Sequence, residues 1–182
     1  MTEIKQVRLA GFGGQGVILA GVLLGQAGVI EGKQTAGSDS YGAQARGSGC
    51  KSEVIFSNGP IDFPHLTTAD TLIAMSQEAY NIYCEEVRDD SGLTLYDNGL
   101  VIPKKDLKVK QLGIPAVEVS VKRLKNKQVA NIVFLGTLIE ATKIVSPKSM
   151  KKAIAMHTSK RFQSLNLKAL RLGMELGRQI HG

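Results

Sequence analysis

A glycine-rich turn between an apolar strand and an apolar helix constrains the fold of this chain most. The turn, Gly11-Phe12-Gly13-Gly14-Gln15-Gly16, follows the apolar residues 7–10 and leads into a run of small and apolar residues. Gly11, Gly13 and Gly16 fit the strand–GxGxxG–helix pattern of nucleotide-binding loops. Glycine permits the positive backbone angles of a tight turn and lets the backbone approach a ligand closely. The start of the following helix adds unpaired N–H groups that suit a phosphate.

Two interpretations of this turn remain open from the sequence. The backbone around Gly13–Gly16 either forms a cradle for a phosphate or pyrophosphate, or makes a tight turn that binds no ligand. Gly14 is a further glycine that the pattern does not require, and Gln15 either donates to a ligand or ties the loop together. A dinucleotide fold also needs an acid near the end of its second strand. Asp39 lies at about that distance, so NAD(P) binding stays an alternative.

Alternating strand and helix patterns predict the architecture. We expect strands at 4–10, 33–38, 51–57, 71–75, 93–96 and 116–121, and helices at 14–31, 77–87, 129–144, 147–157 and 165–180. Such alternation, with helices at the end, is typical of an α/β three-layer, Rossmann-like domain with a mainly parallel sheet. Residues 51–57 alternate as if one face were partly solvated, which favours an antiparallel or edge strand. The length of 182 residues fits one domain, residues 1–182, with its ligand crevice at the carboxyl ends of the strands.

Composition excludes several classes of protein. The longest apolar run, residues 17–24, is too short to span a bilayer, and residues 1–4 do not begin a signal peptide. Cys50 and Cys84 lie far apart and form no C-x-x-C, which argues against an iron–sulfur cluster or a structural zinc within this chain. We therefore expect a reduced, cytoplasmic protein without a membrane anchor.

Charge is distributed unevenly along the chain. Residues 1–103 hold 6 Lys or Arg against 12 Asp or Glu, whereas residues 104–182 hold 17 against 4. This polarity indicates either a basic surface that faces an anionic ligand or an acidic partner, or simply a set of solvated lysines. Nine aromatic residues, none of them Trp, form no stacking platform, so no nucleic-acid partner is expected.

Two further stretches carry candidate ligand contacts. The segment 40–47 places Tyr41, Gly42 and Arg46 in a loop rich in small residues. The guanidinium of Arg46 can bind two oxygens of a carboxylate or phosphate at once, or it can pair with an internal acid such as Asp39. Asn131 lies early in an otherwise apolar helix, where a buried amide must find partners; it either holds a neighbouring loop or reaches the ligand.

No catalytic constellation is visible. His65, His157 and His181 are scattered, with no nucleophile or metal-ligand pattern beside them. The G-x-x-x-x-G-K-[ST] pattern of P-loop NTPases is absent as well. We therefore predict no catalytic residue and no metal site, and expect a binding subunit.

Three motifs together resemble the gamma subunit of 2-oxoacid:ferredoxin oxidoreductases, over nearly the whole chain. They are Gly11-Phe12-Gly13-Gly14-Gln15-Gly16, Tyr41-Gly42-Ala43-Gln44-Ala45-Arg46-Gly47 and Asn131-Ile132-Val133-Phe134-Leu135-Gly136, in that order. The chain departs from the family pattern at Gln44, where Glu is frequent, and at Ser48, where a further Gly is usual. Both departures preserve the size and polarity of the loop.

The resemblance implies a role within a larger enzyme. Such enzymes convert a 2-oxoacid, coenzyme A and oxidised ferredoxin into acyl-CoA, carbon dioxide and reduced ferredoxin. Thiamine diphosphate and iron–sulfur clusters are carried by the alpha and beta partner subunits, and the gamma subunit is associated with coenzyme A binding and with closing the active site. The chain length favours a 2-oxoglutarate enzyme, while pyruvate, branched-chain 2-oxoacid and indolepyruvate enzymes remain open. The predicted coenzyme A-binding residues are Gly11, Gly13, Gly14, Gln15, Gly16, Tyr41, Gly42, Arg46 and Asn131.

Two alternative functions remain open. One is a free-standing NAD(P)-dependent dehydrogenase, which Asp39 alone supports. The other is a purely architectural subunit that binds no small molecule.

Overall fold

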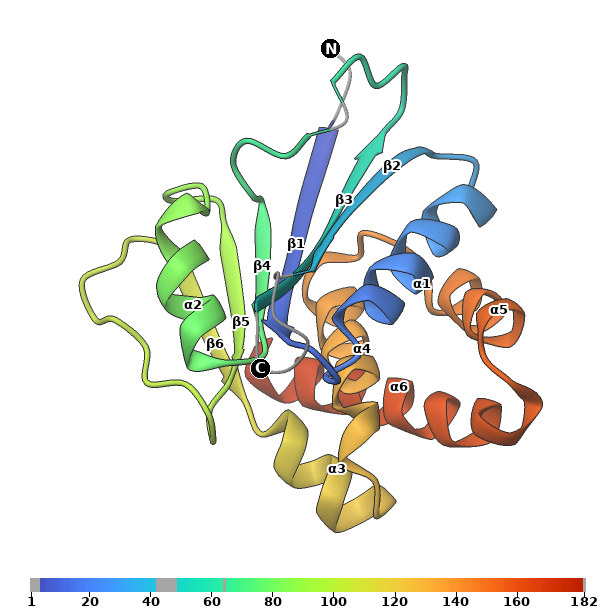
Figure 1. Ribbon diagram of the computed structural model, residues 1–182. Coiled ribbons are helices and arrows are strands. Elements are labelled where there is room, and N and C mark those ends of the chain that lie inside the picture. Colours follow the sequence, from blue (N-terminus) through green and yellow to red (C-terminus); the bar gives the residue numbers. More distant parts are fainter. Residues whose placement is uncertain (1–3, 42–48, 64, 182) are drawn as a thin grey trace.

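A six-stranded sheet with helices on both faces makes up the computed structural model, which describes residues 4–41, 49–63 and 65–181 (Figure 1). The strands are β1 (Ile4–Phe12), β2 (Gln34–Tyr41), β3 (Gly49–Ser57), β4 (Thr71–Ala74), β5 (Leu93–Asp97) and β6 (Lys110–Ile114), in the spatial order β2-β3-β1-β4-β5-β6. β1, β4, β5 and β6 pair in parallel, whereas β3 runs antiparallel to both of its neighbours, β1 and β2. The predicted α/β class is confirmed, with a mixed sheet in which β3 is reversed.

The helices form two layers around the sheet. They are α1 (Val17–Ile30), α2 (Gln77–Tyr83), α3 (Ala116–Leu124), α4 (Ala130–Thr142), α5 (Pro147–His157) and α6 (Lys160–His181), with short 3-10 turns η1 (Cys84–Glu86) and η2 (Lys127–Val129). The larger core joins α1, α4, α5 and α6 to one face of the sheet, and α2 closes a smaller core on the other. Each helix of the described residues is too short or too polar to cross a membrane.

α5 begins as its sequence predicts. The Ser146 hydroxyl accepts a hydrogen bond from the Ser149 N–H at 3.1 Å, and Pro147 occupies the first turn. A serine cap satisfies a backbone donor that the helix leaves unpaired, and proline there loses no hydrogen bond. The local sequence is therefore sufficient to fix this boundary.

The strand predicted at 116–121 is wrong, because this segment is the helix α3. Its valines alternate with polar residues as in a strand, yet Ala116 and Ser120, four residues apart, are the buried positions, as a helix requires. The sixth strand is instead β6, which precedes Pro115. Its sequence, KQLGI, is only weakly apolar because β6 lies at the edge of the sheet.

The segment 51–57 is antiparallel as predicted, but it is neither an edge strand nor partly solvated. β3 lies between β2 and β1, and Glu53 is buried there. Its carboxylate accepts a hydrogen bond from Arg8 Nε at 2.8 Å. The Arg8 guanidinium also pairs with Glu86 and lies 4.6 Å from the centre of the Tyr83 ring. Glu53 therefore belongs to a buried ion pair and not to a solvated face of the strand.

α4 and α6 pack closely through two glycines. A Cβ atom at Gly173 would lie 2.0 Å from the Val133 carbonyl oxygen, and one at Gly136 would lie 2.3 Å from the Leu170 carbonyl oxygen. The Thr137 hydroxyl donates to the Gly173 carbonyl at 3.0 Å across the same interface. The backbones of α4 and α6 are in contact where the two helices cross, so there is no room for a methyl group.

We therefore expect Gly173→Ala to lower the free energy of unfolding by about 1–3 kcal/mol, the usual cost of overpacking. Gly37→Ala is the matched control, because a Cβ atom there would meet only the Glu53 carbonyl, at 3.9 Å. The control should change stability by less than about 0.5 kcal/mol. Urea denaturation of both variants measures the difference, and equal stabilities would contradict the packing described.

Candidate ligand-binding site

The glycine-rich turn has a conformation that only glycine adopts easily. Between the end of β1 and the start of α1, Gly14 has φ 89° and Gly16 has φ 74°. Gly16 is the N-cap of α1 and offers no side chain to its first turn, which also lacks an acidic residue. Because the first N–H groups of a helix have no partner within it, this end of α1 can receive an anion.

Gln15 ties the turn to the sheet. Its side-chain oxygen accepts from the Phe12 N–H at 2.6 Å, and its side-chain nitrogen donates to the Met75 carbonyl at 2.9 Å. A Cβ atom at Gly11 would lie 2.4 Å from that same oxygen. Gly11 therefore leaves room for the Gln15 amide, which joins the end of β1 to the residue that follows β4.

Asn131 holds the other side of the turn. Its side chain is buried, with 2% of its surface exposed, and its nitrogen donates to the Gly16 carbonyl at 3.0 Å. A Cβ atom at Gly16 would lie 2.4 Å from that nitrogen. Of the two roles that the sequence left open for Asn131, the structure supports the holding of a neighbouring loop.

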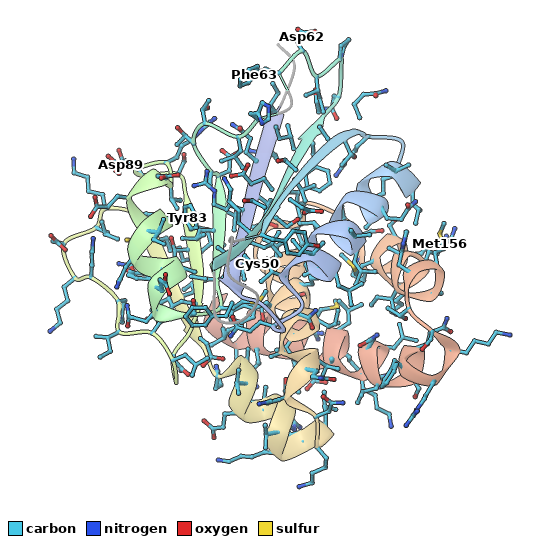
Figure 2. All side chains as sticks on the ribbon, in the orientation of Figure 1. Cys50, Asp62, Phe63, Tyr83, Asp89 and Met156 are labelled. Atoms are coloured by element: carbon cyan, nitrogen blue, oxygen red, sulfur yellow. The ribbon has the colours of Figure 1, made fainter. Side chains whose placement is uncertain are left out.

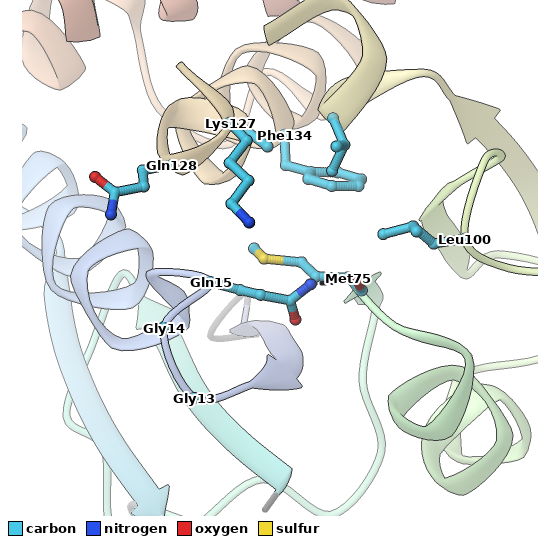
Figure 3. A pocket seen from close by; sticks show the side chains of 10 residues that line it. Gly13, Gly14, Gln15, Met75, Leu100, Lys127, Gln128 and Phe134 are labelled. Atoms are coloured by element: carbon cyan, nitrogen blue, oxygen red, sulfur yellow. Dashed lines mark hydrogen bonds between the residues drawn. The ribbon is translucent and has the colours of Figure 1, made fainter. Parts of the chain in front are cut away.

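A cavity of about 460 Å³ lies beside the turn (Figure 3). It is lined by Gly13, Gly14, Gln15, Met75, Leu100, Val117, Lys127, Gln128, Ala130 and Phe134. Its walls include the residues that follow β1, β4 and β5, so it sits at the carboxyl ends of parallel strands. The spatial order of the sheet reverses between β1 and β4, which is where a ligand crevice is expected.

Lys127 brings a positive charge to this cavity. Its side chain extends from η2 and its amino group is directed into the cavity, near Gln15 and Met75 (Figure 3). Lys127 is exposed, and no acidic residue in the described ranges pairs with it. The amino group and the backbone of the turn Gly13–Gln15, which leads into α1, together suit an anionic group such as a phosphate.

The predicted contact residues separate into three groups. Gly13, Gly14 and Gln15 line the cavity, whereas Gly11, Gly16 and Asn131 stand behind its wall and shape it. Tyr41 ends β2 and is 70% exposed, and it does not line this cavity. Gly42 and Arg46 lie outside the described residues.

Sequence reasoning missed Lys127 and Gln128. Both belong to the stretch that precedes α4, where Asn126 caps η2 by accepting from the Gln128 N–H at 2.8 Å. A polar cap followed by Lys before an apolar helix was a usable signal for an anion site at a helix start. The signal was missed because these residues lie far from the glycine turn in the sequence.

The position of Asp39 does not favour a dinucleotide site. β3 lies between β1 and β2, so the end of β2 is not adjacent to the strand that leads into the glycine turn. The Asp39 carboxylate instead accepts a hydrogen bond from the Ser52 hydroxyl at 2.5 Å. The feature on which the NAD(P) alternative depended therefore has a role within the sheet.

Neither cysteine is activated. Cys50 (labelled in Figure 2) is buried in β3, and Cys84 is buried where η1 begins, directly after α2. Burial raises the pKa of both thiols, so both stay protonated at neutral pH. Within the described ranges, no group of three or more His, Cys, Asp or Glu side chains is arranged to hold a metal ion.

Comparison with known proteins decides the family. A family model described as "Pyruvate ferredoxin/flavodoxin oxidoreductase" matches residues 6–176. The chain belongs to this family. It is a gamma-type subunit of a 2-oxoacid:ferredoxin oxidoreductase, as the three sequence motifs predicted.

Relatives of similar length support this assignment. The 2-oxoglutarate synthase subunit KorC of Methanocaldococcus jannaschii is 41% identical over 179 residues, which cover 97% of this chain and 95% of the relative. KorC of Methanothermobacter thermautotrophicus is 36% identical, with 97% of each chain covered. The gamma subunit of the keto/oxoacid ferredoxin oxidoreductase from Geobacter sulfurreducens PCA has a TM-score of 0.86 at 34% identity, over 96% of this chain and 99% of that chain.

The same fold also occurs within longer chains. The 2-oxoglutarate:ferredoxin oxidoreductase from Magnetococcus marinus, solved with 2-oxoglutarate, coenzyme A and succinyl-CoA, has a TM-score of 0.86 at 22% identity. The match covers 97% of this chain but 31% of that one. At this identity the likeness shows the fold.

The geometry of the turn predicts unequal effects at two of its glycines. Gly16→Ala should lower the free energy of unfolding by about 1–2 kcal/mol from its positive φ, and further because the new methyl group meets Asn131. Gly13→Ala should have little effect, because Gly13 has no positive φ and its Cβ would meet no atom within 4 Å. Thermal and urea unfolding of both variants measure the difference. A Gly13 variant as unstable as the Gly16 variant would contradict this geometry.

Proposed function

We propose that this chain is the gamma subunit of an enzyme that oxidises 2-oxoglutarate, and that the cavity beside the glycine turn binds the diphosphate of coenzyme A. The observation that carries the proposal is that Lys127 and the glycine turn Gly13–Gln15, which leads into α1, line one cavity. In this proposal the subunit also helps to close the active site of the assembled enzyme.

The relatives support 2-oxoglutarate as the substrate of that enzyme. Those that match along their whole length are named 2-oxoglutarate synthase subunit KorC. A ketoisovalerate oxidoreductase subunit, VorA of Methanothermobacter marburgensis, is 31% identical, but the match covers only 38% of it. Length and identity together therefore favour 2-oxoglutarate over a branched-chain 2-oxoacid.

Electrostatics supports coenzyme A as the ligand. Coenzyme A carries a diphosphate and a 3′-phosphate, and residues 104–182, which include Lys127, hold 17 Lys or Arg against 4 Asp or Glu. A cavity lined by one sign of charge raises the local concentration of an oppositely charged ligand. The glycine turn Gly13–Gln15 supplies backbone N–H groups, and Lys127 supplies a point charge for the phosphate oxygens.

Alpha and beta subunits of the same enzyme carry the thiamine diphosphate and the iron–sulfur clusters in this proposal, and ferredoxin accepts the electrons from the complex. This chain binds and orients coenzyme A through its own backbone amides and Lys127. Its free, buried cysteines suit a reducing compartment such as the cytoplasm.

Removal of the Lys127 charge tests whether the cavity binds coenzyme A. In the enzyme reassembled with its co-purifying subunits, Lys127→Gln should raise KM for coenzyme A by about 5- to 20-fold, because a charge-assisted hydrogen bond to phosphate is worth on the order of 1.5 kcal/mol. kcat and KM for 2-oxoglutarate should stay close to their original values. Lys122→Gln is the matched control, since Lys122 is exposed on α3 and outside the cavity. Ferredoxin reduction at varied coenzyme A, and separately at varied 2-oxoglutarate, measures kcat and the two KM values.

A second variant separates binding from assembly. Gly13→Val places a branched side chain toward open space beside the cavity, and it should raise KM for coenzyme A in an enzyme that still assembles. If both Lys127→Gln and Gly13→Val leave this KM unchanged in an intact complex, the subunit is architectural and the proposal fails. Recovery of a stable native complex without thiamine- and cluster-bearing partners would overturn the proposal that this chain works within such an enzyme.

A further inference from the structure

Asp97, the last residue of β5, is a buried carboxylate on the core side of the sheet. Leu93 and Leu95 of the same strand belong to the larger core, and side chains two residues apart share one face of a strand. Asp97 continues this row, and only 1% of its surface is exposed. In the described part of the chain it forms no ion pair with a cation. A buried carboxylate of this kind depends on hydrogen-bond donors for its stability.

Two backbone N–H groups from different elements are its donors. One carboxylate oxygen accepts from the Gly99 N–H at 2.9 Å, and the other accepts from the Val117 N–H at 2.8 Å. Gly99 belongs to the turn after β5, residues 98–101, and Val117 belongs to the first turn of α3. The carboxylate therefore joins these two segments.

The bond to Val117 replaces a missing helix cap. Pro115 is the N-cap residue of α3, and its side chain makes no cap hydrogen bond. A capping oxygen normally accepts from the second or third N–H of a helix, and Val117 is the second residue of α3. Negative charge is also favourable at the start of a helix. Asp97 thus caps α3 from a neighbouring strand.

Both segments that Asp97 holds form walls of the ligand cavity. Leu100 follows Gly99 and lines the cavity (Figure 3), and Val117 lines it as well. Leu100 is 46% exposed, so packing in the core does not fix its position. The Asp97 carbonyl holds the same turn, because it accepts from the N–H groups of Leu100 and Val101 at 3.1 and 2.9 Å. The separation of the two walls therefore depends on one residue.

We infer that Asp97 is a positioning residue for the ligand of this cavity. It determines where Leu100 and Val117 lie relative to each other, and it is not among the residues that line the cavity. The inference rests on the proposed function, because the ligand is the coenzyme A of that proposal. The cavity is then fixed from two directions: Asn131 holds the glycine turn to α4, and Asp97 holds the turn after β5 to α3.

Asp97→Asn tests the inference with almost no change of shape. An amide has one acceptor oxygen, and its nitrogen only donates, so one of the two N–H groups loses its acceptor. In the assembled enzyme, KM for coenzyme A should rise by about 3- to 10-fold, as for part of a charge-assisted hydrogen bond. kcat and KM for 2-oxoglutarate should stay close to their original values. Ferredoxin reduction at varied coenzyme A, and separately at varied 2-oxoglutarate, measures these constants.

Glu53→Gln is the matched control for loss of stability. Glu53 is a similarly buried carboxylate, it accepts from Arg8 in the sheet, and it does not line the cavity. This variant should lower the melting temperature of the complex, as Asp97→Asn does, but leave KM for coenzyme A unchanged. A purely structural residue changes the amount of active enzyme, and only a positioning residue changes this KM.

Hydrogen exchange of the complex without substrates gives a second readout. Asp97→Asn should speed exchange at residues 99–101 and 117–119 and leave residues 12–16 at their original rates, because Gln15 and Asn131 hold the glycine turn independently. Where Asp97→Asn does not assemble, Asp97→Ser replaces it, since a smaller side chain fits the same space and keeps one acceptor. Unchanged exchange at residues 99–101 and 117–119 would overturn the inference.

The kinetic outcomes separate this inference from the proposed function. If Lys127→Gln raises KM for coenzyme A and Asp97→Asn does not, the role of Asp97 is only structural and the proposed function stands. If Asp97→Asn and Glu53→Gln raise this KM equally, the effect comes from lost stability, and the inference is again overturned. If neither Lys127→Gln nor Asp97→Asn affects KM for coenzyme A, both proposals fail.

Discussion

The hydrogen bond from the Asn131 amide to the Gly16 carbonyl is the contact on which the geometry of the site depends. It joins residues 115 positions apart in the chain, the N-cap of α1 and the second residue of α4. One wall of the cavity, Gly13–Gln15, leads into α1, and the opposite wall, Lys127–Ala130, leads into α4. Because the Asn131 side chain is buried, loss of this bond would leave its amide nitrogen unpaired, so the two walls keep a fixed separation.

The glycines of the turn have different structural roles. Gly11 and Gly16 leave space for two amide side chains, those of Gln15 and Asn131. Gly14 supplies a left-handed turn with open space around its Cα, and Gly13 borders the cavity without either constraint. A glycine pattern typical of nucleotide-binding loops is therefore explained in part by amides of the protein, and only the rest is available to explain contact with a ligand.

Sequence reasoning predicted most elements and one wall of the site. The glycine turn, the Ser146 cap and the apolar helices are local features, and their structure follows from neighbouring residues. The errors have non-local causes. Glu53 resembles a solvated position until Arg8 is known to lie opposite, and β6 looks weak because an edge strand is only half covered. Lys127 reaches its cavity because η2, which leads into α4, lies across from the glycine turn, and no local pattern records this placement.

The proposed site contains charge and hydrogen-bonding groups but no acid, base or nucleophile suited to the reaction. Its cation is Lys127, its donors are backbone amides, and both cysteines are buried with raised pKa values. Such a site can hold the phosphates of coenzyme A, which take no part in bond making. Energy from a remote part of a substrate accelerates a reaction when it positions the reacting group, here the thiol at the far end of coenzyme A. A rigid cavity serves this purpose better than a flexible one, because it holds the phosphates in one place. The hydrogen bond from Asn131 of α4 to Gly16, the N-cap of α1, supplies that rigidity.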